Sequence, residues 1–151
     1  MPFCEEQGIG VICYSPLMQG LLTGRWDNAD AVPTYRARTR HFDGKRPKSR
    51  HGEGGHEELL FKTLAAIKQI SESSGHSMLD LALSWPLHNP IVASVIAGMT
   101  KERHVQSNVD AASVKLSPAV VAQLNEATNE LKLAMGSNCD LWQGGENSRC
   151  K

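Results

Sequence analysis

The sequence lacks the features that mark several large classes of protein. Its 151 residues contain no apolar run near the ~20 residues that a membrane-spanning helix needs. Lysine plus arginine equals aspartate plus glutamate, 16 of each, so the chain as a whole is not built for nucleic acid or a membrane surface. Met1–Phe3 leads directly into Glu5 and Glu6, which is unlike a secretory signal. We therefore expect a soluble, cytoplasmic protein.

Cysteine and histidine are present without the spacing of a metal site. The four cysteines form no C-x-x-C pair and no zinc-finger pattern. In the expected compartment they remain reduced thiols. No metal role is assigned to the histidines at 41, 51, 56, 76 and 88.

Two apolar segments have the composition of buried strands. Residues 3–7 are typical of the last turn of a helix that Gly8 ends, and Ile9–Tyr14 follows as a strand rich in β-branched residues. Ile91–Gly98 is the second strand. Neither segment alternates with polar residues, which predicts strands covered on both faces.

The remaining regular structure is predicted to be helical. Leu60, Leu64, Ile67 and Ser71 share one helical face, and Gly75 suits the position after the helix. Ser77 with Asp80 resembles a capping box, and Ser117 followed by Pro118 is a typical helix start. The predicted helices span residues 58–73, 78 to about 87, 100 (with Thr100 as the cap) to about 112, and 118 to about 131.

Strands that alternate with helices predict a parallel α/β sheet. Two strands cannot cover their own faces and edges, so we expect the chain to be part of a larger barrel or sheet. Since it opens on the end of a helix, we also expect that the segment before it has been lost.

A basic stretch separates the first strand from the first long helix. Between Tyr35 and His51 there is one acidic residue, Asp43, and there are seven basic residues: Arg36, Arg38, Arg40, Lys45, Arg46, Lys48 and Arg50. Two interpretations stay open, a solvated, mobile insertion, which we favour, and a lid that faces phosphate. Nucleic-acid binding is disfavoured, because Phe42 is the one aromatic residue after Tyr35 in this stretch and no base-stacking pattern is present.

Three ordered motifs resemble the C-terminal part of an aldo-keto reductase. They are YSPLMQGLLTGRW (14–26), LDLALSWPLHNPIVASVIAGMTKERHVQSNVDA (79–111) and DLWQGGENSR (140–149), and they are most similar to bacterial members of the branch that includes potassium-channel β-subunits. The resemblance implies a TIM (β/α)8 barrel of ~300 residues, within the size range of that fold.

By this resemblance the chain is a partial barrel. Residues 1–14 hold a helix end and strand 7, 15–57 the cofactor loop and insertion, and 58–90 helices. Residues 91–98 are strand 8, 99–131 helices and 132–151 a tail. The catalytic Asp, Tyr, Lys and His of the family belong to the first half of the barrel, and none of their motifs occurs here. Tyr14 is not the catalytic tyrosine.

The resemblance implies much of an NADP(H) site. Tyr14 matches an aromatic ring that stacks on nicotinamide. The loop over the pyrophosphate matches Ser15, Pro16, Leu17, Gln19 and Gly20. Arg25 matches a basic position of the branch, and Arg38 (or Arg36) is a further basic candidate.

The second implied group grips the adenosine end. Gly98 and Thr100 would approach the 2′-phosphate, and His104, Ser107 and Asn108 would face adenine. Two of these depart from the family pattern, since Ser107 stands where glutamate is usual and His104 where arginine or glutamine is usual. Without the resemblance, Tyr14 is an ordinary strand-end aromatic and His104 a surface histidine.

The implied activity of the full-length parent is hydride transfer from NADPH to a small-molecule aldehyde or ketone. We expect no catalytic residue and no turnover in this chain alone. The alternative is a stand-alone nucleotide-binding or interaction module that forms a homo-oligomer through open barrel edges.

Overall fold

The computed structural model describes residues 1–150 and divides the chain into two compact units. Unit 1 comprises Met1–Gly24 and Lys68–Gln123, and unit 2 comprises Arg25–Ile67 and the segment from Leu124 onward. Each unit has its own buried apolar residues, such as Leu81 in unit 1 and Phe42 in unit 2.

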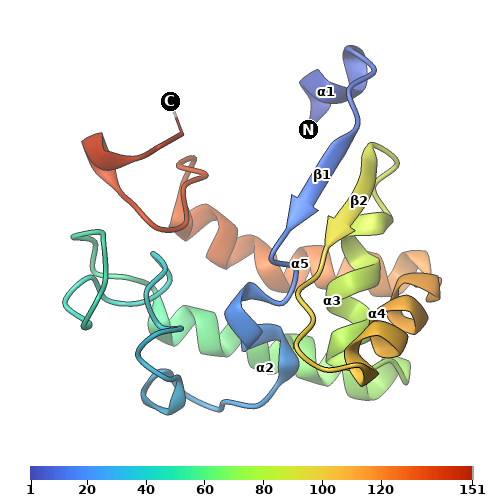
Figure 1. The fold of residues 1–151 in the computed structure, drawn as a ribbon, viewed down its shortest axis with the longest axis horizontal. Helices are drawn as coiled ribbons and strands as arrows, with labels where there is room; N and C mark the ends of the chain where they lie inside the picture. Colours follow the sequence, from blue (N-terminus) through green and yellow to red (C-terminus); the bar gives the residue numbers. More distant parts are fainter. Residues whose placement is uncertain (151) are drawn as a thin grey trace. The chain divides into compact units, whose positions relative to one another are not determined.

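Unit 1 contains a parallel pair of strands, β1 (Val11–Tyr14) and β2 (Val92–Ile96), which lie side by side (Figure 1). Tyr14 is opposite Ile96, and the register shifts once, between Val11 and Ile12. The predicted parallel α/β arrangement is confirmed. Because the strands are parallel and adjacent, the segments that follow Tyr14 and Ile96 both leave the sheet at the carboxyl end of its strands.

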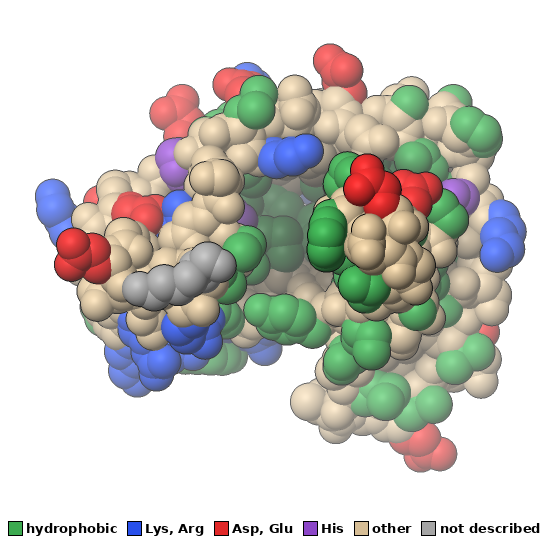
Figure 2. Space-filling model, turned by 90° about the horizontal axis from the view of Figure 1, so that it is seen from above, with side chains coloured by type: hydrophobic (Ala, Val, Ile, Leu, Met, Phe, Trp, Pro, Cys, Tyr) green, Lys and Arg blue, Asp and Glu red, His purple; other side chains and the backbone are tan. Residues whose placement is uncertain are grey.

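The prediction that these strands are buried is wrong for this chain. Ile12 and Ile96 are 62% and 60% exposed. The reason is physical: side chains in a strand point to the faces of the sheet, and a described sheet of two strands cannot itself cover the face on which these side chains lie. Hydrophobic side chains accordingly lie at the molecular surface (green in Figure 2).

Three helices of unit 1 follow the predicted pattern closely. Helix α1 (Pro2–Glu6) ends shortly before Gly8, and α3 (Met78–Leu87) packs against α4 (Arg103–Ser113), β2 and the short 3-10 helix η1 (Met18–Thr23). The predicted capping box of α3 is confirmed. Ser77 Oγ accepts from the Asp80 amide at 3.1 Å, and Asp80 Oδ2 accepts from the Ser77 amide at 2.8 Å.

The predicted cap at Thr100 is wrong. Helix α4 begins at Arg103, with Glu102 at the N-cap position and no side-chain cap. Thr100 lies outside the helix, and its amide donates to His104 Nδ1 at 3.3 Å. The turn before the helix is closed by backbone hydrogen bonds from the His104 amide to Lys101 O and from the Val105 amide to Glu102 O, and Thr100 Oγ1 lies 3.5 Å from His104 Nδ1.

Two long helices supply most of the core of unit 2. Helix α2 (Glu57–Ser74) buries Leu60, Leu64 and Ile67, three of the four residues of the predicted stripe. Helix α5 (Pro118–Met135) buries Leu124, Leu131 and Met135 and extends four residues beyond its predicted end. The short 3-10 helices η2 (Ala29–Ala31) and η3 (Gly145–Asn147) lie in the connecting and terminal segments.

The basic stretch is a folded part of unit 2, so the favoured interpretation of a solvated insertion is wrong for its centre. Phe42 is fully buried, and Arg40 and His41 are each 5% exposed. Gly55 has φ +70°, and a Cβ there would collide with the Phe42 backbone. These contacts hold the chain in one conformation that spacing alone does not reveal.

Three further findings concern the described residues as a whole. No described helix combines the length and apolar character needed to cross a membrane. Among residues 1–150, no group of three or more His, Cys, Asp or Glu side chains could hold a metal ion. All four cysteines are free thiols.

Candidate cofactor site

The loop after β1 has an unusual backbone. Ser15, Met18 and Gln19 have φ values of +56°, +45° and +60°, and Gly20 has +95°. Non-glycine residues seldom adopt this left-handed region. Leu17, with φ −86° and ψ 5°, directly precedes Met18, and such a right-then-left pair has the backbone conformation of anion-binding nests, although the Met18 amide of this pair already donates to Ser15 O.

Backbone hydrogen bonds and packing fix this loop. The Met18 amide donates to Ser15 O at 2.9 Å and the Gly20 amide to Leu17 O at 2.8 Å. Gly24 closes the loop with φ +69°, and a Cβ there would lie 2.8 Å from Sδ of Met78 at the start of α3. The loop is therefore clamped between its own turns and α3.

Tyr14 ends β1 immediately before this loop. Tyr14 is 65% exposed, and its strand partner is Ile96. An exposed ring at the carboxyl end of a parallel strand is available for stacking on a flat ligand. Ser15 and Pro16 follow Tyr14 directly and begin the turn that the hydrogen bond from the Met18 amide to Ser15 O closes.

The second group of candidate residues follows β2. Gly98 has open space at its Cβ position, and Thr100 lies before α4. His104, Ser107 and Asn108 are three and four residues apart, so they share one face of α4, and all three are half-buried. Since His104 Nδ1 accepts from the Thr100 amide, its neutral ring carries the proton on Nε2 and can donate it to a ligand.

The pairing of β1 with β2 brings the two groups of candidate residues to the same end of the sheet, the carboxyl end of both strands. Every candidate residue of unit 1 belongs to the loop that leaves Tyr14 or to the segment that leaves Ile96. Open parallel sheets commonly bind ligands outside the carboxyl ends of their strands. The arrangement can hold an extended ligand that has a flat ring and anionic groups.

Arg25 and Arg38 belong to unit 2. The exposed Arg25 guanidinium lies 5.5 Å from the centre of the Trp26 ring, and Arg36 approaches the same ring at 5.8 Å. Arg38 lies 5.7 Å from the Trp142 ring, and its Nε is buried without a hydrogen-bond partner among the described residues.

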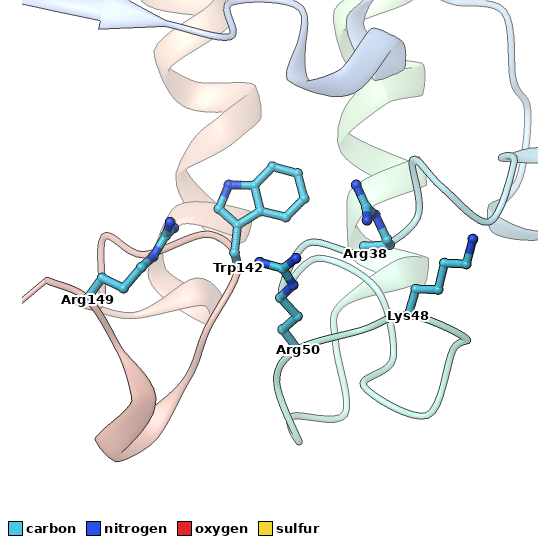
Figure 3. A pocket seen from close by; sticks show the side chains of 5 residues that line it. All are labelled: Arg38, Lys48, Arg50, Trp142 and Arg149. Atoms are coloured by element: carbon cyan, nitrogen blue, oxygen red, sulfur yellow. The ribbon is translucent and has the colours of Figure 1, made fainter.

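Around Arg38 the structure reveals a pocket of about 190 Å³ that sequence reasoning missed. We call it the arginine pocket. Its lining side chains come from three segments and point toward the same side (Figure 3); they are Arg38, Lys48, Arg50, Trp142 and Arg149. The signals available beforehand were the basic stretch and the tail motif, but nothing in the sequence placed them together.

A buried arginine and a buried aspartate join the segments that line this pocket. Arg40 donates to Glu53 Oε2 at 2.7 Å and to the carbonyl oxygens of Asn138 and Met135 at 2.8 and 3.0 Å. Asp140 accepts from Arg149 Nε and Nη2, both at 2.7 Å. The hydrogen bonds from Arg149 hold the pKa of Asp140 well below its usual range.

His41 is a second buried titratable group of this unit. Burial, followed by electrostatic interactions with His56, Arg40 and His51, lowers the pKa of His41 to about 4. Its Nδ1 lies 3.1 Å from Thr39 Oγ1. The ring is therefore neutral at physiological pH.

The chain is similar to longer curated proteins. It is 31% identical over 128 residues to a probable voltage-gated potassium channel subunit beta of Arabidopsis thaliana, covering 83% of this chain and 37% of that protein. It is 30% identical over 137 residues to an L-glyceraldehyde 3-phosphate reductase of Escherichia coli K12, covering 89% and 38%. The chain thus spans less than two fifths of the length of these relatives.

Solved structures share its fold. A glycerol dehydrogenase from Gluconobacter oxydans superposes with a TM-score of 0.64 at 20% identity, covering 85% of this chain and 37% of that one. An aldo-keto reductase from Bacillus halodurans, in its apo form, gives 0.54 at 22%, covering 84% and 37%. The fold is that of part of an α/β barrel.

The resemblance inferred from the motifs is confirmed by a family model. The model described as the aldo/keto reductase family matches residues 1–129, which is most of the chain. The chain belongs to the aldo/keto reductase family.

Proposed function

We propose that this chain is the C-terminal part of an NADP(H)-dependent aldo/keto reductase and carries much of its cofactor site. In this proposal β1 and β2 are strands 7 and 8 of the barrel, and the whole enzyme reduces a small-molecule aldehyde or ketone. The observation that carries it is the parallel pairing of Tyr14 with Ile96, because both candidate segments then begin at the carboxyl end of the sheet.

The cofactor contacts in this proposal are those that the family resemblance implies. Tyr14 stacks on nicotinamide, and the loop from Ser15 to Gly20 approaches the pyrophosphate. Gly98 and Thr100 approach the 2′-phosphate, while His104, Ser107 and Asn108 face the adenine. Arg25 adds a charge for phosphate. The assignment of Arg38 to the cofactor has the least support, because its guanidinium lies over Trp142 in a pocket of its own.

The chemistry of the bound cofactor is hydride transfer to the carbonyl carbon. In this proposal the residues of this chain bind and orient the cofactor. The motifs that carry the catalytic Asp, Tyr, Lys and His of the family do not occur in this sequence. We therefore expect NADPH binding without turnover of an aldehyde. We also propose a cytoplasmic location, which the four free thiols support.

The test is binding of NADPH to the purified chain, followed by the fluorescence of the dihydronicotinamide. Tyr14→Ala and Asn108→Ala should each weaken binding about tenfold, the loss expected for one stacking or hydrogen-bonding partner. Ile12→Ala is the matched control for the first, since Ile12 lies two residues earlier on the same face of β1. Gln106→Ala on the exposed side of α4 is the control for the second.

Loss of affinity in the controls equal to that in the test variants would contradict the proposed site. Oxidation of NADPH by the chain in the presence of a reactive aldehyde would contradict the absence of turnover.

One observation favours a second candidate function, a module that assembles through its sheet edges. The described sheet has two strands, and Ile12, Tyr14 and Ile96 on them are each at least 60% exposed. Unpaired strand edges readily pair with another chain. A single defined oligomer in light scattering, insensitive to NADPH, would favour this module; a polydisperse sample would favour part of an enzyme.

A further inference from the structure

The arginine pocket concentrates positive charge that the described structure does not neutralise. Of its four cationic side chains, Arg149 pairs with Asp140. Arg38, Lys48 and Arg50 form no ion pair with any acid among residues 1–150. No acidic residue lines the pocket. Figure 2 shows Lys and Arg side chains gathered side by side on the surface.

This concentration of charge has costs that folding alone does not explain. Like charges in one hollow repel one another. The buried Nε of Arg38 has no hydrogen-bond partner in the described structure, and Lys48 has φ +66°, which disfavours a side chain with a Cβ. An oxyanion in the pocket would offset these costs by accepting hydrogen bonds from the guanidinium groups.

The pocket is also well supported. Arg40 ties the segment that carries Arg38 to the tail that carries Trp142, through carbonyl oxygens of Met135 and Asn138. The Trp142 amide donates to Asp140 Oδ1 at 2.9 Å, and Asp140 in turn holds Arg149. These bonds place the backbone of the segments that carry Arg38 and Trp142, and the side chain of Arg149, before any ligand binds, which reduces the entropic cost of binding.

The lining of the pocket lies in a different unit from most of the cofactor candidates. The family model ends at residue 129, and Trp142 and Arg149 lie beyond it. All five lining residues belong to unit 2, whereas the stacking and adenine-facing candidates belong to unit 1. A pocket of about 190 Å³ accommodates a small anion with some of its water.

We propose that the arginine pocket binds the phosphate or carboxylate group of a small molecule other than the dinucleotide. The Arg38 and Arg50 guanidinium groups supply paired N–H donors, Lys48 supplies a point charge, and Trp142 forms an apolar wall beneath Arg38. The proposal does not require the cofactor assignment of unit 1 to hold.

The experiment titrates inorganic phosphate, and separately acetate, into the full-length ¹⁵N-labelled chain at constant ionic strength set with chloride. The arginine Nε–H resonances report the pocket directly by NMR, and calorimetry gives the affinity. We expect saturable shifts of Arg38 and Arg50 and competition between the two anions. Arg50→Gln should weaken phosphate binding tenfold or more, as expected for loss of one charged partner.

Lys68→Gln is the matched control, because Lys68 is an exposed cation on α2 outside the pocket. It should change phosphate affinity less than twofold. Thermal unfolding provides a second measurement, since a bound anion raises the midpoint of the parent chain and much less that of Arg50→Gln. This comparison also shows that the variant is folded.

An NADPH arm separates the two sources of phosphate. We expect NADPH to leave bound phosphate in place and Arg50→Gln to leave NADPH affinity unchanged. Displacement of phosphate by NADPH, with an equal loss of NADPH affinity in Arg50→Gln, would assign the pocket to the cofactor and overturn the proposal. Shifts that do not saturate, or equal weakening in Lys68→Gln, would also overturn it. None of these outcomes bears on the Tyr14 and Asn108 variants.

Discussion

The two units of this chain hold their candidate binding residues by different means. In unit 1, Tyr14 and Asn108 follow the ends of paired strands or lie on one helix face, and the backbone of the Ser15–Gly20 loop determines where the ligand would sit. In unit 2, the lining of the arginine pocket depends on the buried side chains of Arg40 and Asp140.

This difference predicts how each unit responds to change. A site made by backbone conformation tolerates loss of single side chains without unfolding, so its variants lose mainly affinity. A site supported by buried charges loses stability and affinity together, because an unpaired buried charge or carbonyl is costly. Stability measurements therefore separate the two kinds of site.

The largest effect is expected for Arg40→Met. Methionine fills much of the space but removes the partner of Glu53 and the donors to the carbonyl oxygens of Met135 and Asn138. Breaking such a buried network costs about 3–5 kcal/mol in the free energy of unfolding. Urea denaturation measures it, and hydrogen exchange should show faster exchange in residues 39–56.

Arg50→Met is the control for Arg40→Met, because Arg50 is exposed and forms no ion pair among the described residues. Its free energy of unfolding should stay within about 0.5 kcal/mol of the parent. A loss below 1 kcal/mol in Arg40→Met would show that the Arg40 network does not stabilise unit 2.

The next effect concerns pH and His41. Its pKa is about 4 in the folded chain, below the ordinary value of 6.5, so the unfolded chain binds more protons between these values. Stability is then fully present above pH 6.5 and falls as pH drops toward 4, by up to about 3 kcal/mol. His41→Gln cannot titrate and should lose less stability over this range.

The stability of His41→Gln at pH 7.5 is the reference for its own pH curve. Taking the difference from this reference removes the effect of the substitution on packing. Urea denaturation at intervals from pH 7.5 to 4 gives both curves. Parallel curves for His41→Gln and the parent would contradict the assignment of the acid loss to this ring.

The features of unit 1 that sequence predicted are local ones. The Ser77–Asp80 capping box, the glycine after α2 and the start of α5 at Pro118 each depend on residues within a few positions of one another. The burial of β1 and β2 was wrong because burial depends on what covers a strand, and composition cannot say whether the covering residues are in the chain.

The features of unit 2 that sequence missed are long-range. Arg40 is bonded to carbonyl oxygens about a hundred residues away, and Arg38 meets Trp142 across a similar distance in the chain. A run of basic residues is typical of a solvated loop, so its buried members look like their exposed neighbours in sequence. The tail motif named Trp142 and Arg149, but nothing local to it showed that they lie beside Arg38.

A moderate effect is expected at the start of α3 in unit 1. Ser77→Ala removes the side-chain acceptor for the Asp80 amide, and loss of an N-cap costs about 1 kcal/mol. Ser77→Asp keeps an acceptor and should retain most of the stability. Urea denaturation checks both, and equal losses in the two variants would show that the cap itself contributes little.

The smallest effect sharpens the comparison, because it concerns an exposed ion pair with nearly the same N–O distance as a partly buried one. Lys62 Nζ lies 2.8 Å from Glu130 Oε2, and Arg40 Nε lies 2.7 Å from Glu53 Oε2. The hydrogen bond with Glu130 raises the pKa of Lys62. The side chains of Lys62 and Glu130 are 69% and 65% exposed, whereas that of Arg40 is 6% exposed.

A double-mutant cycle of Lys62→Ala and Glu130→Ala should give a coupling energy within error of zero at physiological salt, since water and ions screen an exposed pair. The same cycle at Arg40 and Glu53 should give a large coupling that added salt barely changes. If the two cycles agreed, then the N–O distance rather than burial would determine how strongly these ion pairs stabilise unit 2.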